Sequence, residues 1–310
     1  ENGSLSGTLT DGDIRRGLLK GKTLEDNVTE IMNKKFIFSY ENESTIYRKK
    51  IFSTGISHLP ILDRKNNVID LLVSKDEKKE KYLNPIVIMA GGLGSRLRPY
   101  TYDCPKPMLK INGKPILEIV IENFIENGFQ EFYISVNYLK ESIIDYFGDG
   151  SKLGVNIYYL EENKALGTAG SLSLLPKNLD ESFIVINGDV LTKFNPISLL
   201  DYHLKNNAFA TISVRDYLLE VPYGVLEIED KNVINLVEKP IYTKKVNAGV
   251  YALNPEILEY IKFNQKIDMP DIVKIILNLN KKILACPIHE YWIDIGRPET
   301  LEEANISWQK

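Results

Sequence analysis

A glycine-rich loop with two cations follows an apolar run at residues 85–90. Its members are Gly91, Gly92, Gly94, Ser95, Arg96 and Lys106. Glycines let backbone N–H groups come close to a phosphate chain, and two cations meet its negative charge. The spacing therefore predicts a polyphosphate-binding loop at the end of a buried strand.

Two common phosphate motifs are excluded by single residues. A dinucleotide fingerprint needs a third glycine where this chain has Leu97. A P-loop ending at Gly113-Lys114 needs a glycine in place of Met108 and a Ser or Thr in place of Pro115. A plain structural turn requires neither the arginine nor the Pro-Lys-Pro at 105–107.

Two carboxylates follow apolar segments far apart in the sequence. Asp189 ends the run 185–187 plus Gly188, and Asp294 ends Tyr291-Trp-Ile. An ionised carboxylate at the end of a buried strand is costly unless a partner compensates its charge. Taken singly, either Asp could be a helix cap or a turn former.

The pattern Gly-Gly-x-Gly-x-Arg-Leu-x-Pro-x-Thr, followed by Pro-Lys-Pro, resembles the signature of the sugar-1-phosphate nucleotidylyltransferases. By this resemblance Arg96 holds the triphosphate and the leaving pyrophosphate, and Lys106 contacts the α-phosphate. The same resemblance makes Asp189 and Asp294 a pair of Mg²⁺ ligands. Two carboxylates with phosphate oxygens and waters suit octahedral Mg²⁺.

The resemblance also implies a sugar-phosphate site. Glu238 would accept hydrogen bonds from sugar hydroxyls, Lys239 would hold the phosphate, and Asn187, Gly224 and Asn247 would complete the rim. As an isolated dipeptide, Glu238-Lys239 would be an ordinary exposed pair.

The base is expected near residues 159–170. Related uridylyl and thymidylyl enzymes usually have Gln before this loop, where this chain has Glu161 with Glu162 beside it. A carboxylate accepts only, and guanine offers two adjacent donors, so Glu161 predicts guanine. Gly167 and Thr168 belong to a segment that resembles the loop of guanylyltransferases; alternatively, either acid faces water.

The first 82 residues differ from the rest. A charged run at 75–83 predicts a boundary near Tyr82, and residues 1–82 resemble a CBS (Bateman) regulatory domain whose first repeat is truncated. Thr10 and Asp13 match the ribose-binding pattern of that family; in the second repeat Val73 replaces the hydroxyl, while Asp76 remains. An adenine nucleotide is the implied ligand, and packing between subunits is the alternative. Residues 23–33 predict a helix and 58–63 a strand.

Residues 83–310 alternate apolar strands (134–136, 155–160, 183–187) with helical stretches (115–127, 141–147). This predicts an α/β domain, a mostly parallel Rossmann-like or GT-A-like sheet flanked by helices, with ligands at the carboxyl ends of its strands. Strands starting near 209, 223 and 233 predict a meander that forms the sugar side of the cleft. The small N-terminal domain is expected to be α+β.

Composition limits the classes of partner and the cellular compartment that we expect. Residues 84–310 carry 23 basic and 29 acidic side chains, which argues against nucleic acid and for a local cluster of cations and metal. Cys104 and Cys286 are too few for a disulfide framework and favour a reducing cytoplasm. No signal peptide or 18-residue apolar span is evident, so no membrane partner is expected, and a start at Glu1 is typical of a trimmed chain.

CBS modules ahead of such a domain most resemble the glucosamine-1-phosphate guanylyltransferases of bacterial legionaminic acid synthesis. The resemblance implies transfer of GMP from GTP to glucosamine 1-phosphate with Mg²⁺, in a homo-oligomer. Alternatives are a mannose-1-phosphate guanylyltransferase, another hexose-1-phosphate uridylyl- or cytidylyltransferase, or a catalytically silent adenine-nucleotide sensor.

Overall fold

The computed structural model describes residues 4–44, 47–48, 51, 56, 58–73 and 81–308. Its backbone contacts divide the chain into two compact units, residues 1–80 and 81–310. The division falls beside Tyr82, where the charged run predicts a boundary. Each unit is described by itself.

Among its described residues, the N-terminal unit contains the short helix α1 (Asp11–Leu19) and a three-stranded sheet. Strand β2 (His58–Leu62) lies between β1 (Ser39–Tyr40), which is parallel to it, and β3 (Val68–Val73), which is antiparallel. The strand expected at 58–63 is therefore confirmed. Leu59 and Ile61 on β2 are buried and pack with Ile51 in a small apolar cluster.

The helix predicted at 23–33 is wrong. The segment forms turns and a single 3-10 turn, η1 (Val28–Glu30). The Asp26 carboxylate accepts from the Thr23 N–H at 2.7 Å, and the Asn27 side chain accepts from the Thr29 N–H at 3.0 Å. Such local side-chain hydrogen bonds compete with the helical backbone pattern and hold the chain in turns.

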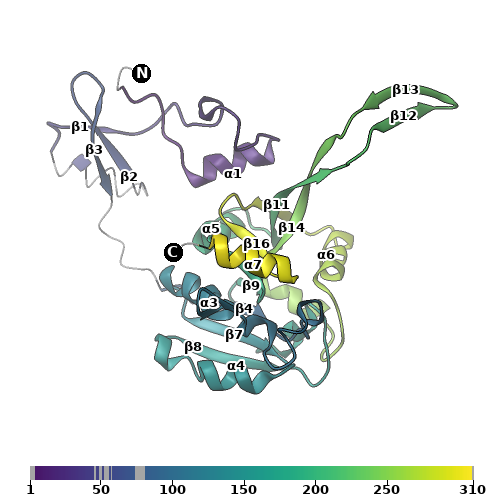
Figure 1. The fold of residues 1–310 in the computed structure, drawn as a ribbon. Helices are drawn as coiled ribbons and strands as arrows, with labels where there is room; N and C mark the ends of the chain where they lie inside the picture. The colour runs from purple at the N-terminus through teal and green to yellow at the C-terminus, as the bar shows by residue number, and fades with distance from the viewer. Residues whose placement is uncertain are drawn as a thin grey trace. The chain divides into compact units, whose positions relative to one another are not determined.

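The C-terminal unit is built on a seven-stranded sheet of order β15-β11-β14-β9-β4-β7-β8 (Figure 1). Its pairings are parallel except for the two that β14 makes with β11 and β9. The predicted parallel-rich α/β sheet is confirmed. The strands are β4 (Ile86–Met89), β7 (Glu131–Val136), β8 (Asn156–Glu161), β9 (Phe183–Asn187), β11 (Ala210–Glu220), β14 (Ile241–Leu253) and β15 (Ile283–Pro287).

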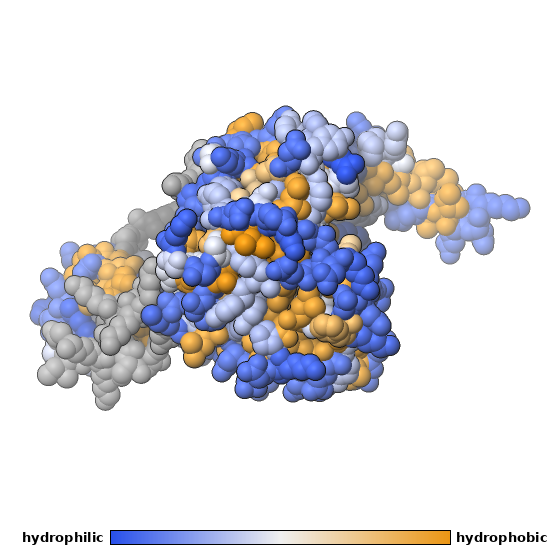
Figure 2. All heavy atoms as spheres, turned by 90° about the horizontal axis from the view of Figure 1, so that it is seen from below, coloured by the Kyte–Doolittle hydropathy of each residue, from blue (hydrophilic) through white to orange (hydrophobic). Residues whose placement is uncertain are grey.

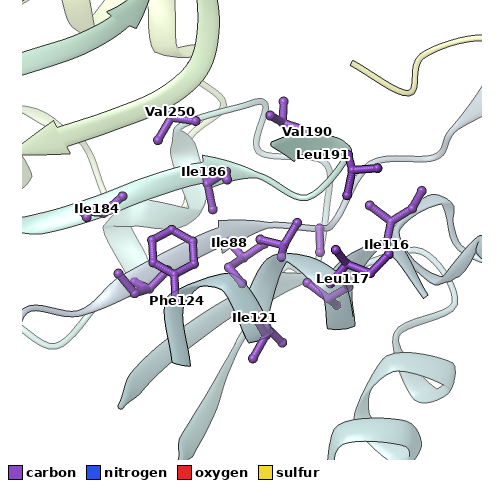
Figure 3. Close-up of a cluster of buried hydrophobic side chains, with 14 of the residues drawn as sticks. Ile88, Ile116, Leu117, Ile121, Phe124, Ile184, Ile186, Val190, Leu191 and Val250 are labelled. Carbon is purple, nitrogen blue, oxygen red and sulfur yellow. The ribbon is translucent and has the colours of Figure 1, made fainter. Parts of the chain in front are cut away.

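Helices cover this sheet, and the predicted helices at 115–127 and 141–147 correspond to the first two. They are α3 (Ile116–Glu126), α4 (Lys140–Phe147), α5 (Pro196–Lys205), α6 (Met269–Asn278) and α7 (Pro298–Ser307). Leu117, Ile121 and Phe124 of helix α3 are buried in the same apolar cluster as Ile88 and Ile184 of the central strands (Figure 3). Spacings of three and four residues put these side chains on one face, and each full burial stabilises the fold by about 1.5–3 kcal/mol.

The central strands meet at a change of chain direction. Strand β4 lies between β7 and β9, so the chain leaves β4 toward one side of the sheet and later enters β9 on the other. Beside this point, β10 (Val190–Thr192) pairs antiparallel with β16 (Trp292–Asp294), with Val190 opposite Asp294. Such switch points leave a crevice at the carboxyl ends of the strands.

A long two-stranded ribbon projects from the same sheet (Figure 1). Beyond the last residues that pair with β15 and β9, strands β11 and β14 continue only with each other and lead into β12 (Val225–Glu229) and β13 (Asn232–Val237). We call residues 217–246 the arm. All are described and none is buried. The expected strands are present as a projecting ribbon, and their role as the sugar side of a cleft stays a prediction.

Apolar side chains dominate the arm's surface. Twelve large hydrophobic residues between Tyr217 and Tyr242 are 41–75% exposed. Figure 2 shows this hydrophobic surface along the projecting segment, with a hydrophilic end. Among the described residues, no helix has the length and apolar character to cross a membrane.

Candidate active site

A cleft of about 670 Å³ opens at the carboxyl ends of β4 and β9. The glycine loop after β4 forms one wall, and the segments after β8 and β9 form the others. Ten residues singled out from the sequence line it: Gly91, Gly92, Gly94, Ser95, Arg96, Lys106, Gly167, Thr168, Asn187 and Asp189. Residues up to 98 positions apart are thus collected at the switch point of the sheet.

Gly94 shapes the loop. It has φ of +61°, which glycine adopts without steric cost, and it precedes the 3-10 turn η2 (Ser95–Leu97). A Cβ here would lie 3.0 Å from side-chain carbons of both Lys106 and Thr101. The Thr101 hydroxyl donates to the Gly94 carbonyl at 2.8 Å. Lack of a side chain at Gly94 therefore lets Lys106 pack directly under the loop.

Lys106 is the buried cation of the cleft. It opens the 3-10 turn η3 (Lys106–Met108) after Pro105 and is only 8% exposed. Its ammonium group forms an ion pair and hydrogen bond with the Asp189 carboxylate. A buried ammonium is costly without such a partner, so the pair fixes the cation at the floor of the cleft.

Asp294 and Arg96 lie beside Gly296, which lines the cleft. A Cβ built on Gly296 would lie 3.6 Å from an Arg96 guanidinium nitrogen and 3.6 Å from the Asp294 carboxylate. The Ile295 N–H donates to the Asp189 carbonyl at 3.0 Å, which joins the segments carrying the two acids. Arg96, Lys106, Asp189 and Asp294 thus lie in one place.

The acid pair is electrostatically strained. Partial burial raises the pKa of Asp294 above its ordinary value, and the neighbouring Asp189 raises it further. Lys106 and Arg96 lower it, but do not cancel the increase. Two neighbouring carboxylates form a donor set that fits a hard divalent cation such as Mg²⁺.

Of the two adjacent acids near the expected base site, Glu162 lines the cleft and Glu161 does not. Glu161, the last residue of β8, is exposed and pairs with Lys140 at 2.7 Å, so it does not line the cleft. Glu162 does line it. Successive side chains of a strand point to opposite faces, so a shift of one residue exchanges the solvent side for the cleft side.

Glu162 also holds its own surroundings. One carboxylate oxygen accepts from the Ser135 hydroxyl, and the other accepts from the Leu166 N–H at 2.9 Å. A Cβ on Gly91 would lie 2.8 Å from the Glu162 carboxylate, so the acid abuts the glycine loop. The carboxylate thereby connects the glycine loop with the loop that follows β8.

Sequence reasoning missed the support of this second loop. Asp268, just before α6, accepts from the Thr168 N–H at 2.9 Å, and the Thr168 hydroxyl accepts from the Met269 N–H at 2.9 Å. Gly167 has φ of +78° and leaves room for Asp268. Lys266 also lines the cleft. These residues carry no motif, and only the tertiary fold brings them to Thr168.

The predicted sugar-phosphate residues are divided. Asn187 lies at the end of β9 in the cleft, and Asn247 lies at the foot of the arm, where its amide donates to the Tyr251 hydroxyl at 2.5 Å. Gly224, Glu238 and Lys239 lie on the arm and are exposed; they are not among the described residues that line the cleft. The expectation that these three complete the cleft rim is not met within one chain.

Thr10 and Asp13 form a capping box at the start of α1. The Asp13 carboxylate accepts from the Thr10 N–H at 2.9 Å and hydroxyl at 2.6 Å, and it pairs with Arg16 at 2.5 Å. Both side chains therefore have a structural task. Val73 ends β3, and Asp76 lies outside the described residues.

Sheet topology and site together define an α/β protein with a glycine loop, two cations and neighbouring carboxylates at the carboxyl ends of its strands. Residues 86–310 match the family described as Nucleotidyl transferase. The chain belongs to this family, which includes sugar-1-phosphate nucleotidyltransferases.

Three relatives illustrate the match. The chain is 32% identical over 231 residues to a UTP–glucose-1-phosphate uridylyltransferase of Synechocystis sp., covering 68% of this chain and 60% of that protein. It is 34% identical over 221 residues to a probable mannose-1-phosphate guanylyltransferase of Oryza sativa subsp. japonica, covering 68% and 61%. The crystal structure of HddC from Yersinia pseudotuberculosis is 31% identical, with a TM-score of 0.59 over 73% of this chain and 100% of that one. The chain thus spans about three fifths of the length of these two curated relatives.

Proposed function

We propose that the protein transfers a nucleoside monophosphate from a nucleoside triphosphate to a hexose 1-phosphate and releases pyrophosphate. The observation that carries this proposal is the meeting of Arg96, Lys106 and Asp189 in one cleft beside the glycine loop, with Asp294 next to them. A triphosphate brings several negative charges, and this cleft offers cations and backbone N–H groups for them.

In the proposed reaction an oxygen of the sugar phosphate attacks the α-phosphorus, and the bond from the α-phosphorus to the bridging oxygen breaks. Lys106, fixed by its burial, would stabilise the charge on the α-phosphate, and Arg96 would hold the departing pyrophosphate. Asp189 and Asp294 would hold Mg²⁺, which supplies charge neutralisation on the phosphate oxygens when bound.

Guanine is the proposed base, with Glu162 rather than Glu161 as its reader. Each Glu162 oxygen accepts one hydrogen bond and has a second lone pair for N1–H or the 2-amino group. A solved structure of HddC is described as complexed with GMP-PN, and HddC is 31% identical to this chain. Both observations support GTP as the donor.

Glucosamine 1-phosphate is the proposed acceptor, as in legionaminic acid synthesis, with mannose 1-phosphate as the alternative. The mannose-1-phosphate guanylyltransferase similarity supports that alternative. Glu238 is the acid proposed to bind the amino group of glucosamine, and Lys239 the cation for its phosphate. Both lie in the segment that links β13 to β14.

The test is pyrophosphate release with Mg²⁺, one sugar phosphate and one nucleoside triphosphate at a time. Glucosamine 1-phosphate and mannose 1-phosphate are each paired with GTP, UTP, CTP and dTTP. The proposal predicts the highest kcat/KM with GTP and glucosamine 1-phosphate. Preference for UTP or CTP would refute the base assignment, and no turnover with any pair would favour a silent nucleotide sensor.

For the N-terminal unit we propose a regulatory role as a CBS-type module that binds an adenine nucleotide near Thr10 and Asp13. Ribose hydroxyls would have to compete with the capping box for the Asp13 carboxylate. Titration of AMP, ADP and ATP against the initial rate tests this role. An unchanged rate together with no heat of binding in calorimetry would leave only the capping function.

A further inference from the structure

The apolar surface of the arm is exposed in the single chain. Isolated two-stranded ribbons are marginally stable in water, and no residue in the arm, which is described throughout, is buried. Leu226 and Ile228 lie two apart on β12 and so share a face with their cross-strand partners Leu236 and Val233. These four side chains are 50–63% exposed. A contiguous apolar face of this kind marks an interaction surface.

The arm also carries three of the predicted sugar-phosphate residues, which are not among the described residues that line the cleft of their own chain. Gly224 packs against Glu238: a Cβ at Gly224 would lie 2.9 Å from the Glu238 carboxylate. Lys239 has φ of +45°, in the left-handed region that costs free energy for a residue with a side chain. Strained backbone at a charged, exposed residue is typical of functional positions.

The cleft and the arm are complementary in chemistry. Among the described residues lining the cleft, the cations are Arg96, Lys106 and Lys266, and the first two are engaged with the acids that would hold Mg²⁺. Lys266 remains for the phosphate of the second substrate, and Lys239 can add a further cation to it. A second copy of this chain is the one partner certain to present the same cleft.

Charge along the arm favours the same partner. The tip, residues 225–237, has three acids and one lysine, whereas the stem, residues 217–224 and 238–246, has three lysines and two acids. Two arms related by a two-fold axis would bring the acidic tip of each copy toward lysines of the other copy. Such self-complementary contact is the rule for two-fold dimers, and exchange of an identical element is a low-cost route to them.

We propose that two copies of the chain exchange arms, so that the apolar face of one arm packs on that of the other. Each arm then supplies Glu238 and Lys239 to the cleft of the partner copy, where they bind the sugar phosphate. This inference rests on the proposed function for the role of the cleft, whereas the exchange itself is a statement about assembly.

Light scattering after size exclusion tests the assembly. The protein is expected to be a dimer, and the double variant Leu226→Asp/Ile228→Asp, which puts two charges on the apolar face, is expected to be a monomer. Ile306→Asp is the matched control, because Ile306 is an apolar side chain on α7 that is 81% exposed. A monomeric wild-type protein, or a double variant as dimeric as the control, would overturn the proposal.

Purified heterodimers test the exchange. One chain carries Lys106→Ala and the other carries Lys239→Ala. The two chains have different tags, are co-expressed, and are isolated as a heterodimer by both tags. Exchange places an intact arm over the one intact cleft, so about half of the wild-type rate is expected at sugar-phosphate concentrations well below KM. Wild type paired with the double variant Lys106→Ala/Lys239→Ala is expected to be nearly inactive.

The reverse result would mean that each arm closes over its own cleft and would overturn the exchange. In that case the first heterodimer is inactive, and the second has about half of the wild-type rate. A wild-type protein that forms the expected dimer but turns over no substrate pair counts against the proposed function instead. For that outcome, one chain carries Leu226→Cys and the other carries Leu236→Cys. A disulfide cross-link between the two chains shows that the arms pack together, and failure to form it refutes the proposal.

Discussion

The two ends of the proposed site are held in opposite ways. At the phosphate end Lys106 is 8% exposed and paired with Asp189, and the loops around it are tied by Glu162 and Asp268. At the sugar end Lys239 is exposed on a ribbon with no buried residue among those described. The phosphate end is therefore preorganised by its own domain, whereas the sugar end depends on whatever covers the arm.

Replacing Lys106 tests the phosphate end and should have the largest effect. For Lys106→Ala we expect kcat to fall by about two orders of magnitude, or roughly 3 kcal/mol of transition-state stabilisation, because a fixed cation beside the α-phosphate is lost. Steady-state kinetics with pyrophosphate detection measure this change. A thermal melt serves as the control, since the variant also leaves Asp189 without its ion-pair partner.

Replacing Lys239 tests the sugar end. Lys239→Ala should raise KM for the sugar phosphate by about tenfold or more while KM for GTP stays constant, because one charge-assisted contact to phosphate is lost. The melting temperature should not change, since the side chain is exposed. Lys231→Ala, at the tip of the same arm, is the control. Equal effects of both substitutions would show that arm charge, rather than position 239, matters.

Glu162→Gln sharpens the assignment of the base. An amide offers one acceptor and one donor group in place of two acceptor oxygens, so the ratio of kcat/KM for GTP over UTP should fall by about tenfold. Glu161→Gln is the neighbouring control and should leave the ratio unchanged, because Glu161 pairs with Lys140 outside the cleft. The opposite ranking of the two variants would restore Glu161 as the reader.

Asp294→Asn has the smallest expected effect on the metal-free protein, and its sign is unusual. Because the pKa of Asp294 is raised above 3.8 in the folded state, the folded protein binds the proton more tightly than the unfolded chain. Stability is thus lost as pH rises from about 3.8 through the raised pKa. At neutral pH without Mg²⁺, the neutral amide should therefore raise Tm by a small amount.

The same substitution should remove the gain in Tm that Mg²⁺ gives the wild-type protein, because one of two carboxylate ligands is absent. Scanning calorimetry with and without Mg²⁺ at pH 4 and pH 7 measures both effects. A lower Tm for the metal-free variant at pH 7 would contradict the assigned cost of burying the ionised Asp294 carboxylate beside Asp189.

Local chemistry explains which parts of the fold could be predicted. The strands that lead to Gly91 and Asp189 are continuous apolar runs, and such runs end in loops at the carboxyl edge of a parallel sheet. Helix α3 could be predicted because Pro115 precedes it and Gly128 follows its C-cap Asn127. These signals all lie within a few residues of the feature that they predict.

The failures have equally local causes. The helix expected at 23–33 was prevented by the side chains of Asp26 and Asn27, which hold turns instead. The sequence could not show which of Glu161 and Glu162 lines the cleft, because periodicity does not reveal at which residue a strand stops. The place of the arm could not be predicted, because alternation in β12 and β13 shows that they pair but not what their apolar face meets.

Gly249 has a consequence for how arm and cleft work together. It lies where β14 leaves the body, with φ of +72°, and a methyl group there would come within 2.8 Å of the Asn187 amide. Alanine at this position would displace either the end of β9 or the root of the ribbon. The lack of a side chain at Gly249 therefore lets the root of the arm that carries Lys239 pack closely against the strand that leads to Asp189.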